Sequence, residues 1–316
     1  MEPKICLALG GGAARGLAHL GVLKVLEDAK IPIHMISGTS LGAMMGGLYA
    51  TYPDAVYWMD RTEEFINNFI SGKTRLDFLR KIEQRDLNDR GFFGDMATLI
   101  RKSFFWGVTA TSSAFIGEEE YRNFMYPLIP DISVDQTKIP FSCVATDIRN
   151  GKRIMYTKGS LRTAISASCA LPGIFPPVRD NGMVLVDGGW VERVPILCGR
   201  EMGADIVIGV DVSGAVEKFE VESGLDIILR ADAVTRIYLN DILASKADLL
   251  IHPAVETTCW ADFSNPKEMY KQGEIAASEK LKQIQDIIRR ATLQKKTFAD
   301  QVRSLTDRII DALIGR

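Results

Sequence analysis

The sequence has few cysteines and few histidines. Its five cysteines are scattered, odd in number, and form no C-x-x-C pair. This usage predicts neither a disulfide framework nor a metal site, and it indicates reduced, mostly buried thiols of a cytosolic protein. Histidine occurs only as His19, His34 and His252. Histidine-based catalysis therefore has few candidates, and we expect no metal and no other cofactor.

The sequence also lacks a strong net charge and a long apolar run. Its formal charge is −2, and 47% of its residues are hydrophobic and 25% charged, as in a soluble globular protein. We therefore expect no nucleic-acid partner and no segment that crosses a bilayer. Met1 leads almost directly into a strand and a glycine loop, which predicts no signal peptide. The expected location is cytoplasmic, with any membrane contact peripheral, at the inner membrane surface.

What the sequence does contain is a serine between two glycines, Gly38-Thr39-Ser40-Leu41-Gly42. Extended apolar residues precede this motif and an apolar helical stretch follows it. A strand, a sharp turn and a helix form the nucleophile elbow, in which the glycines let neighbouring backbones approach while the serine hydroxyl stands at the end of the sheet. The motif predicts that Ser40 is a nucleophile supported by Gly38 and Gly42. A turn built from small residues is the alternative.

A glycine-rich loop spans residues 10–16, between a predicted strand at residues 4–9 and a helical pattern that continues to Ala29. A dinucleotide site would require a glycine where Arg15 stands, and a nucleoside triphosphate site would require a lysine that the loop lacks. The remaining ligand is an oxyanion formed on Ser40, which each backbone N–H donor would stabilise by on the order of 3 kcal/mol. Arg15 either holds the loop or contacts substrate.

A neutral serine hydroxyl needs a base within hydrogen-bond reach. His19 lies in the first predicted helix, and His34 lies at the far end of the strand that leads to Ser40. Only His252, which closes a late predicted strand, is topologically suited to the role. A capping or surface histidine is the alternative interpretation of that residue.

A carboxylate is the other candidate base. Asp187 follows the apolar strand at residues 184–186 and precedes Gly188 and Gly189, so it is released at the end of a buried strand without obstruction. A partly desolvated aspartate has a raised proton affinity, which makes it a useful base. We therefore predict a dyad of Ser40 and Asp187, with an ordinary Asp-Gly turn as the alternative.

Three stretches, in this order, resemble the patatin-like phospholipases, specifically their compact bacterial branch: residues 10–16, residues 38–42 and Asp187-Gly188-Gly189. The resemblance extends from residue 4 to about residue 255. It implies an α/β fold, a three-layer α/β/α sandwich with a mainly parallel central sheet. It also implies hydrolysis of acyl esters of phospholipids or lysophospholipids, without metal, through an acyl-Ser40 intermediate.

The same resemblance implies a role for each motif. Ser40 is the nucleophile, Asp187 its base, and the N–H groups of Gly11, Gly12 and Ala13 form the oxyanion hole. The family usually has glycine where this chain has Ala13, although an alanine N–H still donates.

The expected organisation is a catalytic domain at residues 1–255, with residues 86–115 as a lid, followed by a helical extension at residues 256–316. Aromatic residues crowd residues 92–106, which predicts either a satellite core or a mobile lid that touches a lipid surface. From Glu279 to Arg316 there are nine Lys or Arg and five Asp or Glu. Such a basic amphipathic helix packs on its own domain, lies on anionic lipid or pairs with a partner helix.

Two other functions remain open from the sequence. Related acyltransferases that act on thioesters share this fold but use a histidine partner. A catalytically silent lipid-binding regulatory protein would keep the fold without the chemistry, and the complete motifs argue against it.

Overall fold

The computed structural model describes residues 2–70, 107, 112–214 and 224–314. Within this part of the chain, eight strands form one sheet in the order β5-β6-β3-β2-β1-β7-β8, and β4 pairs with β3. The strands are β1 (Ile5–Leu9), β2 (Met35–Thr39), β3 (Phe141–Asp147), β4 (Lys152–Tyr156), β5 (Val178–Asp180), β6 (Met183–Asp187), β7 (Ile206–Val210) and β8 (Leu249–Ile251).

The sheet is mainly parallel, as predicted. β1, β2, β3, β7 and β8 pair in parallel, whereas β4, β5 and β6 are antiparallel to their partners. Every residue of β1, β2, β3 and β7 is buried. Strands of a parallel sheet are buried on both faces because helices cover both.

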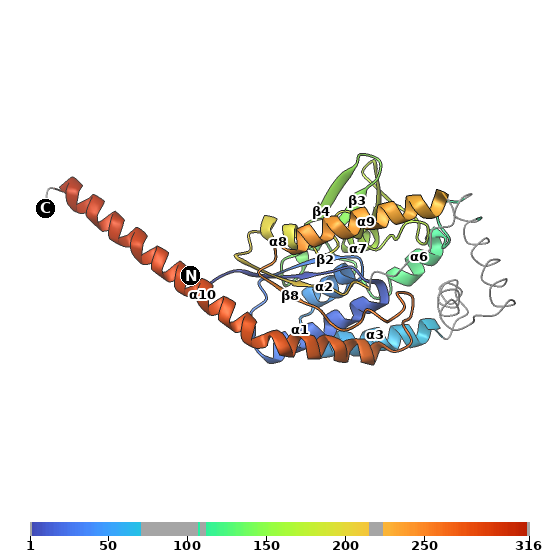
Figure 1. The fold of residues 1–316 in the computed structure, drawn as a ribbon, viewed down its shortest axis with the longest axis horizontal. Helices are drawn as coiled ribbons and strands as arrows, with labels where there is room; N and C mark the ends of the chain where they lie inside the picture. Colours follow the sequence, from blue (N-terminus) through green and yellow to red (C-terminus); the bar gives the residue numbers. More distant parts are fainter. Residues whose placement is uncertain (1, 71–106, 108–111, 215–223, 315–316) are drawn as a thin grey trace.

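Helices lie on both faces of the sheet, which gives the predicted three layers (Figure 1). Strand residues alternate between the two faces. Accordingly, Ile5, Leu7 and Leu9 pack with α1, α2 and α10, whereas Cys6 and Ala8 pack beside α8. The helices are α1 (Ala18–Asp28), α2 (Leu41–Thr51), α3 (Ala55–Ile70), α6 (Glu118–Met125), α7 (Leu161–Ser168), α8 (Ile196–Glu201), α9 (Gly224–Ala244) and α10 (Pro266–Ile314), with short 3-10 helices η1 (Ala13–Leu17), η2 (Val134–Gln136) and η3 (Gly188–Trp190).

Strands β2 and β6 meet end to end along one edge of β3. β2 runs parallel to β3 and ends with Thr39 opposite Val144. β6 runs antiparallel to β3 and ends with Asp187 opposite Ala145, the next residue along. β4 occupies the other edge of β3 over residues 143–147, so β2 and β6 must share the remaining edge. The carboxyl ends of two strands that are far apart in sequence are therefore neighbours.

The first half of α10 belongs to the core. Ala277 and Ile284 are fully buried there, and α10 crosses α1 where Gly21 and Gly273 let the two backbones approach. The second half projects away from the sheet (Figure 1). The domain division at residue 255 stays a prediction. The expected lid at residues 86–115 lies outside the described residues except for 107 and 112–115.

No described helix is both long enough and apolar enough to span a membrane.

The crossing of α1 and α10 leads to a prediction about stability. In a Gly21→Ala variant the new Cβ would lie 1.9 Å from the Tyr270 carbonyl oxygen, so the two helices must separate. We expect the free energy of unfolding to fall by about 3 kcal/mol, the upper range for overpacking. Gly224→Ala is the matched control, since a Cβ on this helical glycine meets no atom of the described residues within 4 Å. Equal melting temperatures for the two variants would contradict the packing of α10.

Candidate active site

Ser40 stands in the sharp turn between β2 and α2. Its backbone angles, φ 55° and ψ −129°, are strained for a residue with a side chain, as the nucleophile elbow requires. Its N–H donates to Ser168 Oγ at 2.9 Å, and its carbonyl accepts the first N–H groups of α2. At Gly42 a Cβ would lie 2.2 Å from the Leu9 carbonyl oxygen. Only glycine there lets the turn close against β1.

Asp187 ends β6 beside this turn, and its side chain is buried, whereas Ser40 is half-buried. Asp187 is 3% exposed, and the Ser40 hydroxyl lies near its carboxylate and lowers its pKa. Asp187 Oδ1 also accepts the Gly189 N–H at 2.7 Å. The backbone is held by Ala170, whose carbonyl accepts the Asp187 N–H, and by Thr146, whose hydroxyl donates to the Asp187 carbonyl. The structure thus brings together the two residues that the sequence predicts as a dyad.

The environment of Asp187 raises its proton affinity. Burial raises the pKa of the Asp187 carboxyl to about 6, while the nearby Ser40 hydroxyl, the hydrogen bond from the Gly189 N–H and the charges of Arg193 and Arg236 act in the opposite direction. A carboxylate with such a pKa is ionised at neutral pH and can still accept a proton from a nearby hydroxyl.

The glycine loop lies against Ser40, but its N–H groups are not equivalent. The Gly11 N–H donates to the Arg193 carbonyl at 2.9 Å, so it is occupied. Within the described chain the N–H groups of Gly12 and Ala13 have no such partner. Ala13 has φ 47°, a conformation that suits glycine better than alanine. Two of the three predicted oxyanion donors therefore remain available. Gly11 lets the loop lie close to Ser40, since a Cβ added at Gly11 would lie 3.1 Å from Ser40 Cβ.

Each histidine has a role elsewhere. His19 Nε2 lies 2.7 Å from the Gly10 carbonyl, and burial lowers its pKa to about 4, so the neutral ring donates to the loop. His34 Nδ1 accepts the Ile5 N–H. His252 is half exposed, with Nδ1 3.9 Å from Asp211. The structure brings Ser40 together with Asp187 and with none of these histidines.

A pocket of about 760 Å³ opens over Ser40 and Asp187. One part of its wall is apolar and comes from α2, α6 and the segment after α7; it contains Met44, Phe124, Met125, Leu171 and Phe175. Another part is mostly cationic and comes from α9 and the segment after β6; it contains Trp190, Arg193, Arg230 and Arg236, with Asp241 as an acidic member. Arg15 lines the pocket as well, beside Gly214, so both interpretations of Arg15 stay open.

Sequence reasoning missed most of this wall. Arg193 follows the Asp187-Gly188-Gly189 motif closely, and α9 carries Arg230 and Arg236, but neither feature indicates a pocket by itself. Ser168, the acceptor for the Ser40 N–H, lies in the small-residue stretch before Pro172. Its hydroxyl was an available signal, because a hydroxyl in a buried helix needs a partner.

The chain belongs to the patatin-like phospholipase family, whose family model matches residues 7–197. It is similar to the lysophospholipase NTE1 of Candida glabrata, with 30% identity over 295 residues, which are 85% of this chain and 15% of that protein. Similarity to the lysophospholipase NTE1 of Mycosarcoma maydis is 35% over 208 residues, 66% of this chain and 10% of that protein. The chain thus spans only 10–15% of the length of these two curated relatives.

Among solved structures, VipD from Legionella pneumophila is similar with 14% identity and a TM-score of 0.41, over 88% of this chain and 67% of that chain.

The bond between Ser168 and Ser40 leads to a testable prediction. A Ser168→Ala variant leaves the Ser40 N–H without its acceptor, which costs about 1–3 kcal/mol when the group is buried. We expect urea unfolding to show that loss. Ser166→Ala is the matched control, since Ser166 Oγ is buried in the same helix and has no hydrogen-bond partner among the described residues. Its removal should leave stability unchanged or raise it. A larger loss in Ser166→Ala than in Ser168→Ala would contradict the assignment.

Proposed function

We propose that this chain is a serine acyl hydrolase that cleaves acyl ester bonds of phospholipids or lysophospholipids through an acyl-Ser40 intermediate. The observation that carries the proposal is that Ser40 and the buried carboxylate of Asp187 line one pocket, close enough for the Ser40 hydroxyl to lower the pKa of the carboxyl, beside the available N–H groups of Gly12 and Ala13. Membership of the patatin-like phospholipase family and similarity to lysophospholipases support it.

In the first half of the proposed reaction, Asp187 takes the proton of the Ser40 hydroxyl as Oγ attacks the ester carbonyl carbon. The negative charge then develops on the carbonyl oxygen, where the N–H groups of Gly12 and Ala13 and the start of α2 stabilise it. The tetrahedral intermediate collapses, the C–O bond to the alcohol breaks, and Asp187 returns the proton to the leaving alkoxide.

In the second half, water replaces the alcohol. Asp187 takes a proton from water, the hydroxide attacks the acyl carbon, and the same donors stabilise the second oxyanion. The bond to Ser40 Oγ breaks, the fatty acid leaves and the serine regains its proton. The apolar wall of Met44, Phe124, Met125, Leu171 and Phe175 suits the acyl chain throughout.

The proposal includes a cytoplasmic location. It also includes peripheral contact with a membrane, through residues 92–106 or the C-terminal helix. Residues 92–106 lie outside the described residues. The outer face of α9, next to the pocket, exposes Ile227, Ile228, Val234, Tyr238 and Ile242. An apolar helix face beside the pocket is what an enzyme that takes its substrate from a lipid surface needs.

The proposed dyad predicts the effect of three substitutions. Ser40→Ala removes the nucleophile and Asp187→Asn removes the base, so each should lower kcat for a p-nitrophenyl ester by about 1000-fold or more. His252→Ala should retain activity within about twofold, since this exposed ring has no part in the reaction.

Labelling with a fluorophosphonate probe completes this test. Wild-type protein should be labelled at Ser40, which a silent lipid-binding regulator would not be. Loss of activity in His252→Ala equal to that in Ser40→Ala would contradict the dyad and favour an acyltransferase type of site.

The raised pKa of Asp187 predicts the pH dependence. Only the ionised carboxylate accepts the serine proton, so kcat/KM for a p-nitrophenyl ester should fall as pH drops below about 6. It should fall about tenfold per pH unit at still lower pH. The same acidic limb should persist in His252→Ala protein. A profile that stays flat from pH 8 to pH 4 would show that Asp187 is not the base.

A further inference from the structure

The cationic wall of the pocket contains an arginine whose charge is not paired. Arg193 lines the pocket, and in the described part of the chain its guanidinium makes no ion pair or hydrogen bond with a carboxylate. Asp211, Asp241 and Asp187 act on it only through their longer-range charge, and burial lowers the pKa of Arg193. A half-buried cation without a direct partner is unfavourable, and an anion bound in the pocket would stabilise it.

Arg236 stands near Arg193 and is held in a fixed orientation. Its guanidinium stacks on the Trp190 ring, with 4.6 Å from Cζ to the ring centroid, and its Nε donates to Asp232 at 2.8 Å. The two terminal nitrogens of the guanidinium remain free for a ligand as far as the described chain shows. The charge of Arg236 contributes to the lowered pKa of Arg193, so the two cations repel each other across the pocket wall.

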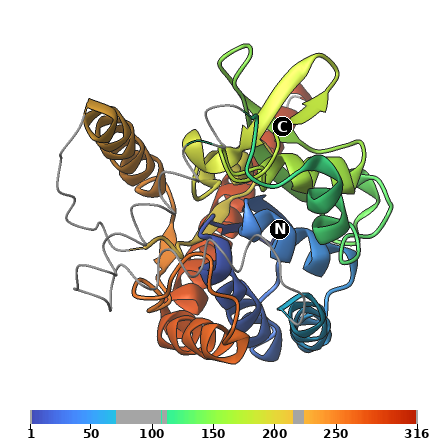
Figure 2. The same cartoon turned by 90° about the vertical axis from the view of Figure 1, so that its right-hand side faces the viewer.

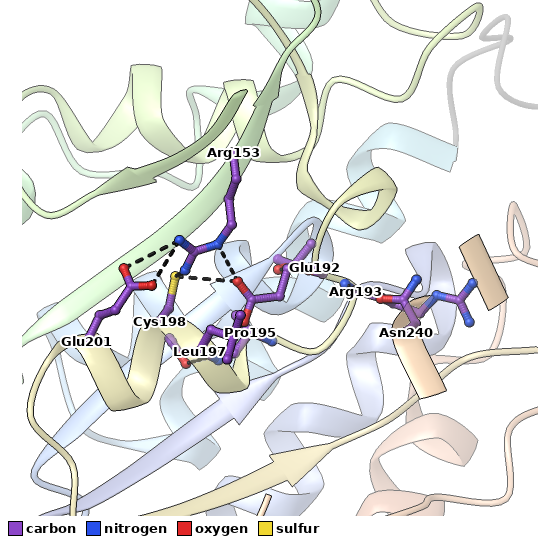
Figure 3. Close-up of polar contacts among 10 residues, drawn as sticks. Arg153, Glu192, Arg193, Pro195, Leu197, Cys198, Glu201 and Asn240 are labelled. Carbon is purple, nitrogen blue, oxygen red and sulfur yellow. Dashed lines mark hydrogen bonds and ion pairs between the residues drawn. The ribbon is translucent and has the colours of Figure 1, made fainter. Parts of the chain in front are cut away.

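The backbone fixes Arg193 relative to the reaction centre. Its N–H donates to Asn240 Oδ1 of α9 at 2.6 Å, and its carbonyl accepts the Gly11 N–H. Figure 3 shows that the Glu192 side chain extends toward Arg153, whereas Arg193 extends to the other side, toward Asn240. The guanidinium is thus presented from a segment that is anchored both to the glycine loop and to α9.

Both arginines line the same pocket as Ser40 and Asp187, and the charges of both lower the pKa of Asp187. In a lysophospholipid at most three glycerol carbons separate the ester oxygen from the phosphate, so the phosphate must bind near Ser40. Paired guanidinium groups are the preferred protein ligands of phosphate oxygens. Part of the apolar wall, Phe124 and Met125, lies on α6, which Figure 2 shows apart from α9. The acyl chain and the headgroup can therefore occupy different parts of the pocket.

We propose that Arg193 and Arg236 bind the phosphate diester of a lysophospholipid while its ester bond lies at Ser40. This inference rests on the proposed function and adds to it a preference for esters that carry phosphate next to the scissile bond.

The test compares two substrates that differ in the phosphate. Palmitoyl-lysophosphatidylcholine and monopalmitoylglycerol carry the same acyl chain and are assayed in the same neutral detergent micelles at pH 8.5, where Asp187 is ionised. In Arg193→Gln and Arg236→Gln, kcat/KM for the phospholipid should fall at least about tenfold, the loss expected for a charge-assisted hydrogen bond. For monopalmitoylglycerol it should stay within about twofold, since a neutral ester makes no such bond.

Arg61→Gln is the control, because Arg61 is exposed on α3 and its ion-pair partner among the described residues is Glu64. Arg193→Lys, which keeps the charge without the planar fork, should lose less than Arg193→Gln. Equal losses for both substrates, or no loss for either, would overturn the inference. Inhibition of monopalmitoylglycerol hydrolysis by inorganic phosphate, without any preference for the phospholipid, would assign the arginines to free phosphate and also overturn it.

Direct binding separates this inference from the proposed function. Calorimetry with lysophosphatidylcholine and Ser40→Ala protein needs no turnover. If adding Arg193→Gln weakens binding at least about tenfold, the result supports the phosphate site. This holds even if the wild-type protein hydrolyses neither ester, an outcome that would refute only the proposed function. Unchanged binding would refute the phosphate site.

Discussion

The site depends on one feature of the sheet, the edge of β3 that β2 and β6 share. Thr39 faces Val144, and Asp187 faces the next residue, Ala145, so the ends of the two strands point at each other. A strand has only two edges, and β4 holds the other one. The separation of Ser40 and Asp187 is therefore fixed by backbone hydrogen bonds of a buried sheet, the most rigid support that a protein offers.

The segment that follows the dyad aspartate extends this support. The buried carboxylate of Glu192 accepts hydrogen bonds from Arg153 Nε at 2.5 Å and from the Leu197 N–H at 2.6 Å (Figure 3). The Glu192 carbonyl accepts the hydroxyl of Thr39, the residue before Ser40. Its neighbour Arg193 holds Gly11 through its own carbonyl. One short segment thus ties together the elbow, the glycine loop and the cationic wall.

The sequence predicts the motifs better than it predicts their surroundings. Ser40 and Asp187 each follow a strand and each adjoin glycines, which are local signals, and their order matches a known family. The antiparallel entry of β6, which causes the two residues to meet, has no local signal because it depends on the pairing of β3. The pocket wall is harder still. Phe124, Arg193 and Arg236 come from three distant segments, and only the folded chain shows that they line one cavity.

The features that make the site reactive lower the stability of the folded chain. The pKa of Asp187 rises from its ordinary value of 3.8 to about 6 on folding. Folding is therefore not penalised by this carboxyl below pH 3.8, where it is protonated in both states, and the folded state loses stability as pH rises through 6. The loss amounts to about 3 kcal/mol at neutral pH. Ser40 and Ala13 add strained backbone with positive φ. Two of the four described non-glycine residues with positive φ thus lie beside the buried carboxylate, above the buried strands β1 and β2. A rigid core that holds a group in a reactive state is expected to carry such strain.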